Sequence, residues 1–453
     1  MNDRTLLTGA GALLALSAPA SAQNMRPNVI VIYTDDHGTL DMNCYGARDL
    51  RTPHMDTLAA RGVRFTQFYA APVSSASRAS LMTGQFTARA GLTGNAGDRG
   101  LPTDKETIAE RMQANGYRTA CIGKWHLGSL REYAPNSRGF DYFWGFLGGC
   151  IDSYSHFYYW GGPNRHDLWC NDREIYRSGT FFAEETLREA ERFIASGDGR
   201  PFFLYWAVNI PHYPLQPSEK WLEYYADLPE PRRQYAAFVS TFDDCLGGLR
   251  TFLRETGLEE NTIVILQSDN GHSTEVRTFG GGGYCGNYRG GKFSLFEGGI
   301  RVPALISWPG HLPQGAVRDQ MAMNIDWFPT ILDLCGIDAA GCDVDGKSLV
   351  EVLLDGSAPA PHETLHFDFE RQWAVRHGDW KLLFNAIDVR PNDRNVTLEG
   401  LFLTNLKMDP SESRNLLEVY PQQAGELLEL RLQYVASLSG PKKRPADHAP
   451  AGE

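Results

Sequence analysis

The chain has 453 residues, of which 42% are hydrophobic and 22% charged, so it is long enough for one large α/β domain and a smaller second one. The formal net charge of −12 and the lack of a basic cluster exclude a general attraction to nucleic acid or to anionic lipid. An anionic substrate must therefore be recognised by a few local cations and a metal ion.

Residues 1–22 have the pattern of a secretory signal peptide. One basic residue, Arg4, precedes the small-apolar run Ala10–Leu16, and the stretch ends in the cleavage pattern Ala20-Ser21-Ala22. The run is shorter than the ~20 apolar residues that a membrane span requires, and no later run approaches that length. We therefore expect a periplasmic or secreted protein without a membrane span.

Export permits disulfide bonds among the eight cysteines. Cys335 and Cys342 are the closest pair in the sequence, but the cysteine spacings match no zinc-binding pattern and fix no pairing. Some of these cysteines are expected to be buried thiols.

Four predicted strands are each followed by polar side chains. Asn28–Tyr33 and Thr262–Leu266 are β-branched runs typical of buried parallel strands, and 117–122 and 201–208 are also strand-like. The polar residues that follow these strands are, in chain order, Asp35 and Asp36, Lys124 and His126, Asn209 and His212, and Asp269 and Asn270. Because ligands bind beyond the carboxyl ends of the strands in open α/β sheets, these side chains are expected to converge on one crevice.

Helices are predicted around these strands, at residues 52–61, 104–115, 182–195, 232–255 and 325–335, with a further strand at 302–307. The stretch Phe140–Trp169 is crowded with aromatic residues and glycine and shows no clean period, which predicts a long loop excursion. Its aromatic side chains either line a sugar-binding site or pack beneath the loop.

A domain boundary is expected near residues 355–361, where Gly, Ser, Ala and Pro interrupt the periodic pattern. Short strand-like pieces and a helix at about 421–438 follow, which predicts a small antiparallel sheet with one helix. The predicted organisation is a signal peptide (1–22), a large α/β domain with a mostly parallel central sheet flanked by helices (23–358), a C-terminal α+β subdomain with an antiparallel sheet (359–440) and a flexible tail (441–453).

The stretch Ser74–Gly84, SSASRASLMTG, has the pattern of a helix start, because serine caps free amides and the following residues favour helix. Ser74 is either a structural cap only, or its oxygen lies at the positive end of a helix dipole with Arg78 one turn later. The second arrangement suits an anionic tetrahedral group.

Four oxygen-donating side chains follow two of the buried strands, namely Asp35, Asp36, Asp269 and Asn270. Such hard ligands suit calcium or magnesium rather than zinc. Each pair taken alone is also typical of turn residues at a strand end, and the joint placement favours a cation site.

Two histidines that follow strand ends, His126 and His212, have the chemistry of a general acid or base near neutral pH, although lone histidines are often structural. His37 and His272 are either extra ligands, partners of the ligands or substrate contacts. The cations Arg78, Lys124 and Lys292 would bind a tetrahedral dianion if they converge, and singly each is typical of a solvated surface charge.

Ordered motifs extend along nearly the whole chain after the leader. They are VIYTDDHG, TPHMDTLAARGVRFTQFY, SSASRASLMTGQ, GKWHLG, PHYP, SDNGH, RGGKFSLFEGGIRVP, DWFPTILDLCGI, RHGDWKLL and DPSESRNLL. With these motifs the chain resembles the formylglycine-dependent sulfatases of the alkaline-phosphatase superfamily, and each motif alone is weak. The resemblance implies an alkaline-phosphatase-like fold for the large domain.

The resemblance also implies roles for the residues that match the motifs. Ser74 occupies the position that is oxidised to formylglycine, whose hydrated aldehyde attacks sulfur. Arg78 would stabilise the formylglycine, Lys124 and Lys292 would bind sulfate, His212 would protonate the leaving alcohol, and His126 would take a proton from the second hydroxyl. A calcium ion would be bound by Asp35, Asp36, Asp269, Asn270 and the group at Ser74.

The motif departs from the commonest family pattern, C-x-P-x-R, because Ser74 replaces cysteine and Ala76 replaces proline. Unmodified serine lacks the second hydroxyl that allows release of sulfate, so an enzyme with unmodified Ser74 would stall before that release. The S-x-A-x-R form resembles the serine-type bacterial sulfatases, which implies oxidation by a radical S-adenosylmethionine maturase.

The sequence thus predicts an exported sulfatase that hydrolyses sulfate esters, on a sulfated carbohydrate in view of the leader and the aromatic excursion. Two alternatives stay open. One is a phosphoester or phosphonate hydrolase of the same superfamily. The other is an inactive carbohydrate-binding pseudoenzyme, if Ser74 is not oxidised or stands where a cysteine was deliberately replaced.

Overall fold

The computed structural model describes residues 26–159 and 162–438. The predicted signal peptide (1–22) and flexible tail (441–453) lie outside these residues. Within them, no helix is both long enough and apolar enough to cross a bilayer. All eight cysteines lie in described residues and none forms a disulfide.

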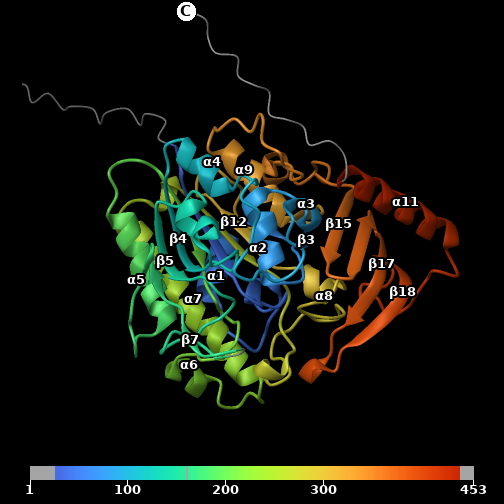
Figure 1. Cartoon of the computed structure of the whole chain (residues 1–453), viewed down its shortest axis with the longest axis horizontal. Coiled ribbons are helices and arrows are strands. Elements are labelled where there is room, and N and C mark those ends of the chain that lie inside the picture. Colours follow the sequence, from blue (N-terminus) through green and yellow to red (C-terminus); the bar gives the residue numbers. More distant parts are fainter. Residues whose placement is uncertain (1–25, 160–161, 439–453) are drawn as a thin grey trace, which may run out of the picture.

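The large domain is built on a ten-stranded sheet with the order β13-β2-β12-β11-β1-β10-β4-β5-β8-β9 (Figure 1). The five central strands β11, β1, β10, β4 and β5 are parallel to one another, while β12 and β8 pair antiparallel at either side. The sheet strands are β1 Asn28–Thr34, β2 Gly62–Phe65, β4 Arg118–Lys124, β5 Tyr142–Phe146, β8 Trp169–Cys170, β9 Arg173–Glu174, β10 Phe202–Ala207, β11 Thr262–Ser268, β12 Ala304–Ser307 and β13 Ala316–Arg318. Outside it, β3 Phe68–Tyr69 pairs with β14 Ala322–Met323, and β6 Phe157–Tyr158 pairs with β7 Arg165–His166.

Helices cover both faces of this sheet, because successive apolar residues of a strand point to opposite sides. Val31 and Tyr33 of β1 pack into the core formed with α2, α4, α9 and α10, whereas Ile30 and Ile32 pack into the core formed with α1, α5, α6 and α7. The helices are α1 Pro53–Ala60, α2 Ser74–Thr83, α3 Thr87–Ala90, α4 Ile108–Ala114, α5 Phe182–Ala195, α6 Glu219–Tyr224, α7 Arg232–Glu255, α8 Glu297–Ile300, α9 Trp327–Leu334, α10 Val350–Leu354 and α11 Pro421–Leu438.

The C-terminal part is a separate four-stranded antiparallel sheet beside the large domain, as Figure 1 shows for the orange and red strands. One face, with Phe367 and Leu383, packs against Phe296 and Met321 of the large domain, and α11 covers the other through Leu427. The strands are β15 Thr364–Phe369, β16 Gln372–His377, β17 Trp380–Asp388 and β18 Val396–Asn405. The predicted α/β class with a C-terminal antiparallel sheet is therefore confirmed, and the exact domain boundaries stay a prediction.

Several predicted elements have the bounds expected from the sequence, including α5, α7 and α11. The prediction that 140–169 is a loop excursion is wrong in part, because the aromatic run Tyr142–Phe146 forms β5 and pairs with β4 inside the sheet. The helix expected to begin at Asp104 begins later, at Ile108, where Thr107 and Glu110 form a capping box over its first turn.

Candidate active site

The carboxyl ends of the central strands bring the predicted polar residues together. Asp35 and Asp36 follow β1, and Asp269 and Asn270 follow its parallel neighbour β11. The Asp36 amide donates to Asp269 Oδ1 at 3.1 Å, and Asn270 Nδ2 donates to Asp36 Oδ1 at 2.7 Å. The predicted convergence of these strand ends on one crevice is confirmed, and all four side chains are fully buried.

Ser74 is the first residue of α2, but it does not cap that helix. The N-cap is Val73, and no side chain caps the helix. The Ser74 hydroxyl instead donates to Asp35 Oδ1 at 3.0 Å and accepts from Lys124 Nζ at 3.2 Å. Of the two alternatives for Ser74, the structural cap is therefore wrong, because its oxygen bonds to the strand-end residues rather than to the helix amides.

Three buried cations lie against the three carboxylates, one against each. Lys124 Nζ lies 2.7 Å from Asp35, Lys292 Nζ lies 2.9 Å from Asp36, and Arg78 Nη2 lies 3.1 Å from Asp269. Buried charges are tolerated when they are paired in this way. The pairing shows that none of these cations is a solvated surface charge.

Arg78 is held in place by aromatic residues as well as by charge. Its guanidinium donates to the Tyr205 hydroxyl at 2.9 Å and lies 5.4 Å from the centre of the Tyr33 ring. A further Nη1 bond at 3.2 Å reaches the backbone carbonyl of Lys124, so Arg78 connects the start of α2 to the end of β4.

The proximity of the carboxylates perturbs their pKa values in different directions. Burial and the neighbouring Asp35 charge raise the pKa of Asp269 to about 7. Burial also raises the pKa of Asp36 to about 6, although the nearby Lys292 opposes this. Burial alone would raise the pKa of Asp35, but Lys124, His212 and Arg78 together hold it well below its usual value. Three acids this close disfavour simultaneous ionisation unless further positive charge is present.

The donor set fits a hard divalent cation. Carboxylate oxygens of Asp35 and Asp36 and a ring nitrogen of His212 all lie within 4.8 Å of one another. The Asn270 amide oxygen faces the same place, because it lies 3.5 Å from Ser74 Oγ. This oxygen-rich set is the one that Ca²⁺ or Mg²⁺ prefers, and a cation there would offset the mutual repulsion of the acids. His212, which was expected at the same crevice, lies beside these carboxylates, with its Nε2 3.8 Å from Asp36 Oδ2.

His126 and His212 flank the same centre from β4 and β10. Burial and the neighbouring lysines hold the pKa of both rings well below the usual value, so each is neutral at pH 7 in the free protein. His212 Nδ1 lies 2.8 Å from the Tyr213 carbonyl, which assigns the proton of the neutral ring to Nδ1 and leaves a lone pair on Nε2. Gly149 allows the His126 ring to approach, since a Cβ there would lie 3.0 Å from it.

The other two histidines that the sequence placed near the acids, His37 and His272, have different surroundings from His126 and His212. His37 Nε2 lies 2.9 Å from the Asp41 carbonyl, and the ring of His272 packs against Gly283. Neither residue is among the described residues that line the cavity above Ser74. His37 instead joins the two strand ends, because its backbone amide donates to Ser268 Oγ at 3.0 Å.

A cavity of about 420 Å³ opens above Ser74. Its lining includes Ser74, His126, His212 and Lys292. The other two predicted catalytic residues, Arg78 and Lys124, are buried behind this lining, where Lys124 contacts Ser74 Oγ. Among the described aromatic residues of the stretch 140–169, Tyr158 alone lines this cavity, whereas Trp144 and Phe146 pack in the core. The packing interpretation therefore holds for part of the stretch, and a sugar-binding role stays a prediction. The sequence missed Asn95, Asp98, Arg165 and Arg277, which also line the cavity and belong to no periodic pattern or recognised motif.

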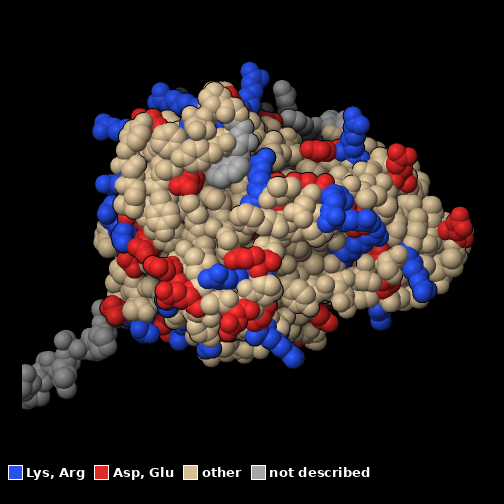
Figure 2. Space-filling model, turned by 90° about the horizontal axis from the view of Figure 1, so that it is seen from below, with Lys and Arg blue, Asp and Glu red and all other residues tan. Residues whose placement is uncertain are grey.

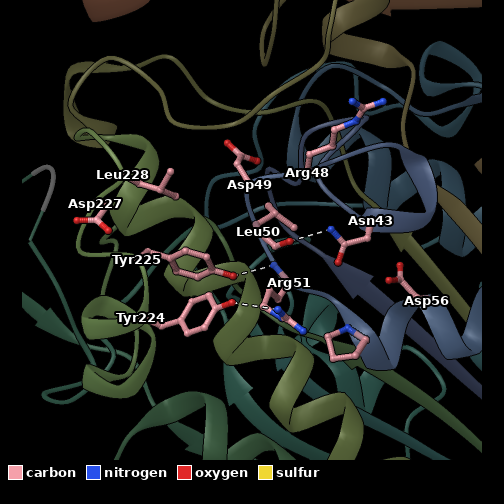
Figure 3. A pocket seen from close by; sticks show the side chains of 11 residues that line it. Asn43, Arg48, Asp49, Leu50, Arg51, Asp56, Tyr224, Tyr225, Asp227 and Leu228 are labelled. Atoms are coloured by element: carbon pink, nitrogen blue, oxygen red, sulfur yellow. Dashed lines mark hydrogen bonds between the residues drawn. The ribbon is translucent and has the colours of Figure 1, made fainter.

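A second hollow, of about 500 Å³, lies over the segment 43–56 and the end of α6 (Figure 3). Its polar groups bond one another: Arg51 donates to Tyr224 and Tyr225, and Asn43 donates to the Leu50 carbonyl. It shares no lining residue with the cavity above Ser74.

Comparisons with known proteins agree with this geometry. The model of the sulfatase family matches residues 27–337, and a model described as N-sulphoglucosamine sulphohydrolase, C-terminal, matches residues 289–433. Arylsulfatase A of Homo sapiens is 32% identical over 465 residues, which cover 91% of this chain and 86% of that protein. N-acetylgalactosamine-6-sulfatase of Rattus norvegicus is 33% identical over 377 residues, which cover 76% of this chain and 69% of that protein.

Solved structures are similar over almost the whole fold. The crystal structure of Ps i-CgsB in complex with k-i-k-neocarrahexaose has a TM-score of 0.81 at 29% identity, over 90% of this chain and 93% of that chain. PsFucS1 sulfatase from Pseudoalteromonas sp. has a TM-score of 0.78 at 25% identity, over 92% and 91% of the two chains. The chain therefore belongs to the sulfatase family, whose members are hydrolases of sulfuric esters.

Proposed function

We propose that this sulfatase removes sulfate from a sulfated carbohydrate, using a formylglycine derived from Ser74 and a bound calcium ion. The observation that carries the proposal is the position of the Ser74 hydroxyl, 3.0 Å from Asp35 and 3.2 Å from the Lys124 ammonium, at the end of a cavity that also contains two histidines. The saccharide substrate is supported by similar proteins whose names include N-acetylgalactosamine-6-sulfatase and a neocarrahexaose complex.

Calcium would be held by Asp35, Asp36, Asp269 and Asn270, together with the group at Ser74. Bound there, the ion supplies positive charge that polarises the sulfate ester and favours the ionised form of the carboxylates. The three buried acids and the amide oxygen at this point are the donors that such an ion requires.

Oxidation of Ser74 to formylglycine supplies a hydrated aldehyde with one hydroxyl to attack sulfur and a second to allow release of sulfate. The serine side chain and Ala76 favour a radical S-adenosylmethionine maturase as the partner that carries out this oxidation. Lys124 contacts the Ser74 oxygen and holds this side chain in position, and Arg78, one turn later on α2, donates to the backbone carbonyl of Lys124.

The cations of the site bind the sulfate group. Lys292 and Lys124 are both buried and both border the Ser74 end of the site, where they donate charge-assisted hydrogen bonds to sulfate oxygens. Charge on these oxygens is stabilised best by donors that are already in place, as in phosphoryl transfer.

The two histidines move protons on opposite sides of the reaction. His212 donates from Nε2 to the leaving alcohol, and His126 accepts a proton from the second hydroxyl at position 74. Both rings are neutral in the free protein because they are buried beside lysines. An anionic sulfate ester in the cavity offsets those lysine charges, which favours the protonated form of His212 at the moment when an acid is needed.

The leader pattern of residues 1–22 supports export to the periplasm or beyond, where sulfated polysaccharide is degraded. Figure 2 shows acidic and basic side chains interspersed on the face seen from below. Recognition of an anionic substrate is assigned to the cavity above Ser74, because Lys292 lines it.

A pair of aryl esters tests the reaction class. We expect the protein, produced with a suitable maturase and calcium, to release 4-nitrophenol from the sulfate ester faster than from the phosphate ester, with Ser74→Ala as the inactive control. Faster phosphate turnover would favour a phosphoester hydrolase. Saccharide binding without any turnover by the matured protein would favour a pseudoenzyme.

A further inference from the structure

Two arginines line the cavity without a role in the catalytic centre. Arg165 belongs to β7 and Arg277 to the turn after β11, and both side chains are exposed. Neither guanidinium forms an ion pair within the described part of the chain. Arg165 lies 4.9 Å from the centre of the Tyr158 ring, and Arg277 donates to the Tyr213 hydroxyl at 3.1 Å.

The two guanidinium groups lie on different walls. Arg277 contacts Tyr213, which adjoins the proposed acid His212. Arg165 lies beside the glycine pair that supports His126, because a Cβ on Gly148 would lie 3.4 Å from Arg165 Nη2. The cavity therefore has a cation on the side of each histidine, beyond the lysine that faces the scissile sulfate.

The charged side chains that line the cavity have a positive sum. Lys292 is offset by Asp36, and the one carboxylate in the described lining is Asp98, which accepts a bond from Ser129 at 2.7 Å. Two further acids lie outside the described lining. Glu275 lies 3.7 Å from Lys292 and also attracts Arg277 electrostatically. Asp167 accepts bonds from the backbone amides of residues 147 and 148 and attracts Arg165. The chain as a whole has a net charge of −12, so two exposed guanidinium groups lining one cavity indicate a local role in binding an anion.

The contacts of Arg165 with Tyr158 and of Arg277 with Tyr213 favour binding of an oxyanion. Stacking on Tyr158 and bonding to Tyr213 restrict each guanidinium, while N–H donors on each remain unassigned to an ion pair. Guanidinium groups recognise carboxylates and sulfate-like oxyanions through paired hydrogen bonds. A volume of about 420 Å³ is within the range of ~300–1,000 Å³ for small-molecule sites, so it accommodates more than the scissile sulfate.

We propose that Arg165 and Arg277 bind a second anionic group of the substrate, a further sulfate or a carboxylate, so that the enzyme prefers polyanionic saccharides to singly sulfated ones. This inference rests on the proposed carbohydrate sulfatase function.

Binding to the Ser74→Ala protein in calcium-containing buffer tests the inference without turnover. The ligands are a monosulfated disaccharide, its disulfated analogue and a monosulfated disaccharide that contains a uronate, titrated by calorimetry. We expect a second anion to lower Kd by about tenfold, and Arg165→Ala or Arg277→Ala to remove that gain while Kd for the monosulfated ligand stays within about twofold. The ligand that shows the gain identifies the second anion as sulfate or carboxylate.

Arg173→Ala is the matched control, because Arg173 is exposed on β9 and is absent from the described cavity lining. Equal binding of the three ligands, or equal weakening of all three by the arginine substitutions, would overturn the inference, as would undetectable binding of every saccharide. Release of sulfate by the matured protein is measured separately with 4-nitrophenyl sulfate. A failure of that reaction refutes the proposed function, whereas the binding series refutes the second-anion site.

Discussion

Lys381 joins the C-terminal sheet to the large domain through two buried glutamates, and its replacement by methionine should destabilise the protein strongly. Its ammonium lies 2.9 Å from Glu297 on α8 and 2.9 Å from Glu412, and all three side chains are fully buried. Glu412 also accepts the Glu297 amide at 2.6 Å, so the three residues form one network. Methionine fills similar space and removes the charge.

The size of the effect follows from what each glutamate keeps. Glu297 retains Arg301 at 3.3 Å, whereas Glu412 loses its cation. Breaking a buried pair by removing one partner costs about 3–5 kcal/mol. Burial raises the pKa of Glu412 to about 7 even with Lys381 present, so this glutamate can take up a proton and reduce the cost. We therefore expect a loss near the lower limit, about 3 kcal/mol.

Urea unfolding at pH 7.5, followed by circular dichroism, measures this loss. Lys220→Met is the matched control, because Lys220 pairs with Asp244 at 2.8 Å with both side chains exposed and should contribute less than about 1 kcal/mol. If Lys381→Met costs no more than the control, the network of Lys381, Glu297 and Glu412 does not stabilise the junction.

Three further predictions concern titration, calcium and proton transfer. Burial and Arg431 lower the pKa of His366 from 6.5 to about 4, so the unfolded chain takes up a proton first and stability is lost as the pH falls from about 6.5 to 4. His366→Phe should remove about 2 kcal/mol of that loss at pH 5, measured by urea unfolding at pH 5 and 7.5, and an unchanged pH dependence would contradict the pKa shift. Asp269→Ala should abolish both activity and calcium binding in calorimetry, and full calcium affinity would show that the ligand assignment is wrong. His212→Gln should lower kcat by about 10²–10⁴-fold for a sugar sulfate and much less for 4-nitrophenyl sulfate, whose leaving group needs little protonation, so equal losses would exclude a general acid.

The core of the site could be predicted because it rests on one rule of sheet architecture. Apolar runs such as Asn28–Tyr33 identify central strands, and parallel neighbours must place their following residues at one edge. Asp35, Asp36, Asp269 and Asn270 are therefore found together as expected. The long amphipathic helices α5 and α7 were predictable for a related reason, since their periodic patterns extend over several turns.

Other features could not be predicted, because their signals are short or depend on tertiary contacts. Ser74 has the composition of a helix cap, and only the position of Asp35 and Lys124 across the crevice explains why its hydroxyl turns away from the helix. The helix expected at 52–61 ends as predicted, but the sequence does not indicate that Gly62, directly after it, already begins β2, where a Cβ would lie 2.0 Å from the Ile306 carbonyl oxygen. Arg165 lies on a two-residue strand, and the pattern of its sequence does not indicate that it faces the cavity.

The central claim is that Ser74 becomes the formylglycine nucleophile, and mass spectrometry of the Ser74 peptide from protein made in its native host tests it most directly. We expect a loss of two hydrogens, ~2 mass units, in the active protein and an unmodified serine after production without a maturase. An intact serine in protein that hydrolyses sulfate esters at full rate would show that formylglycine is not the nucleophile.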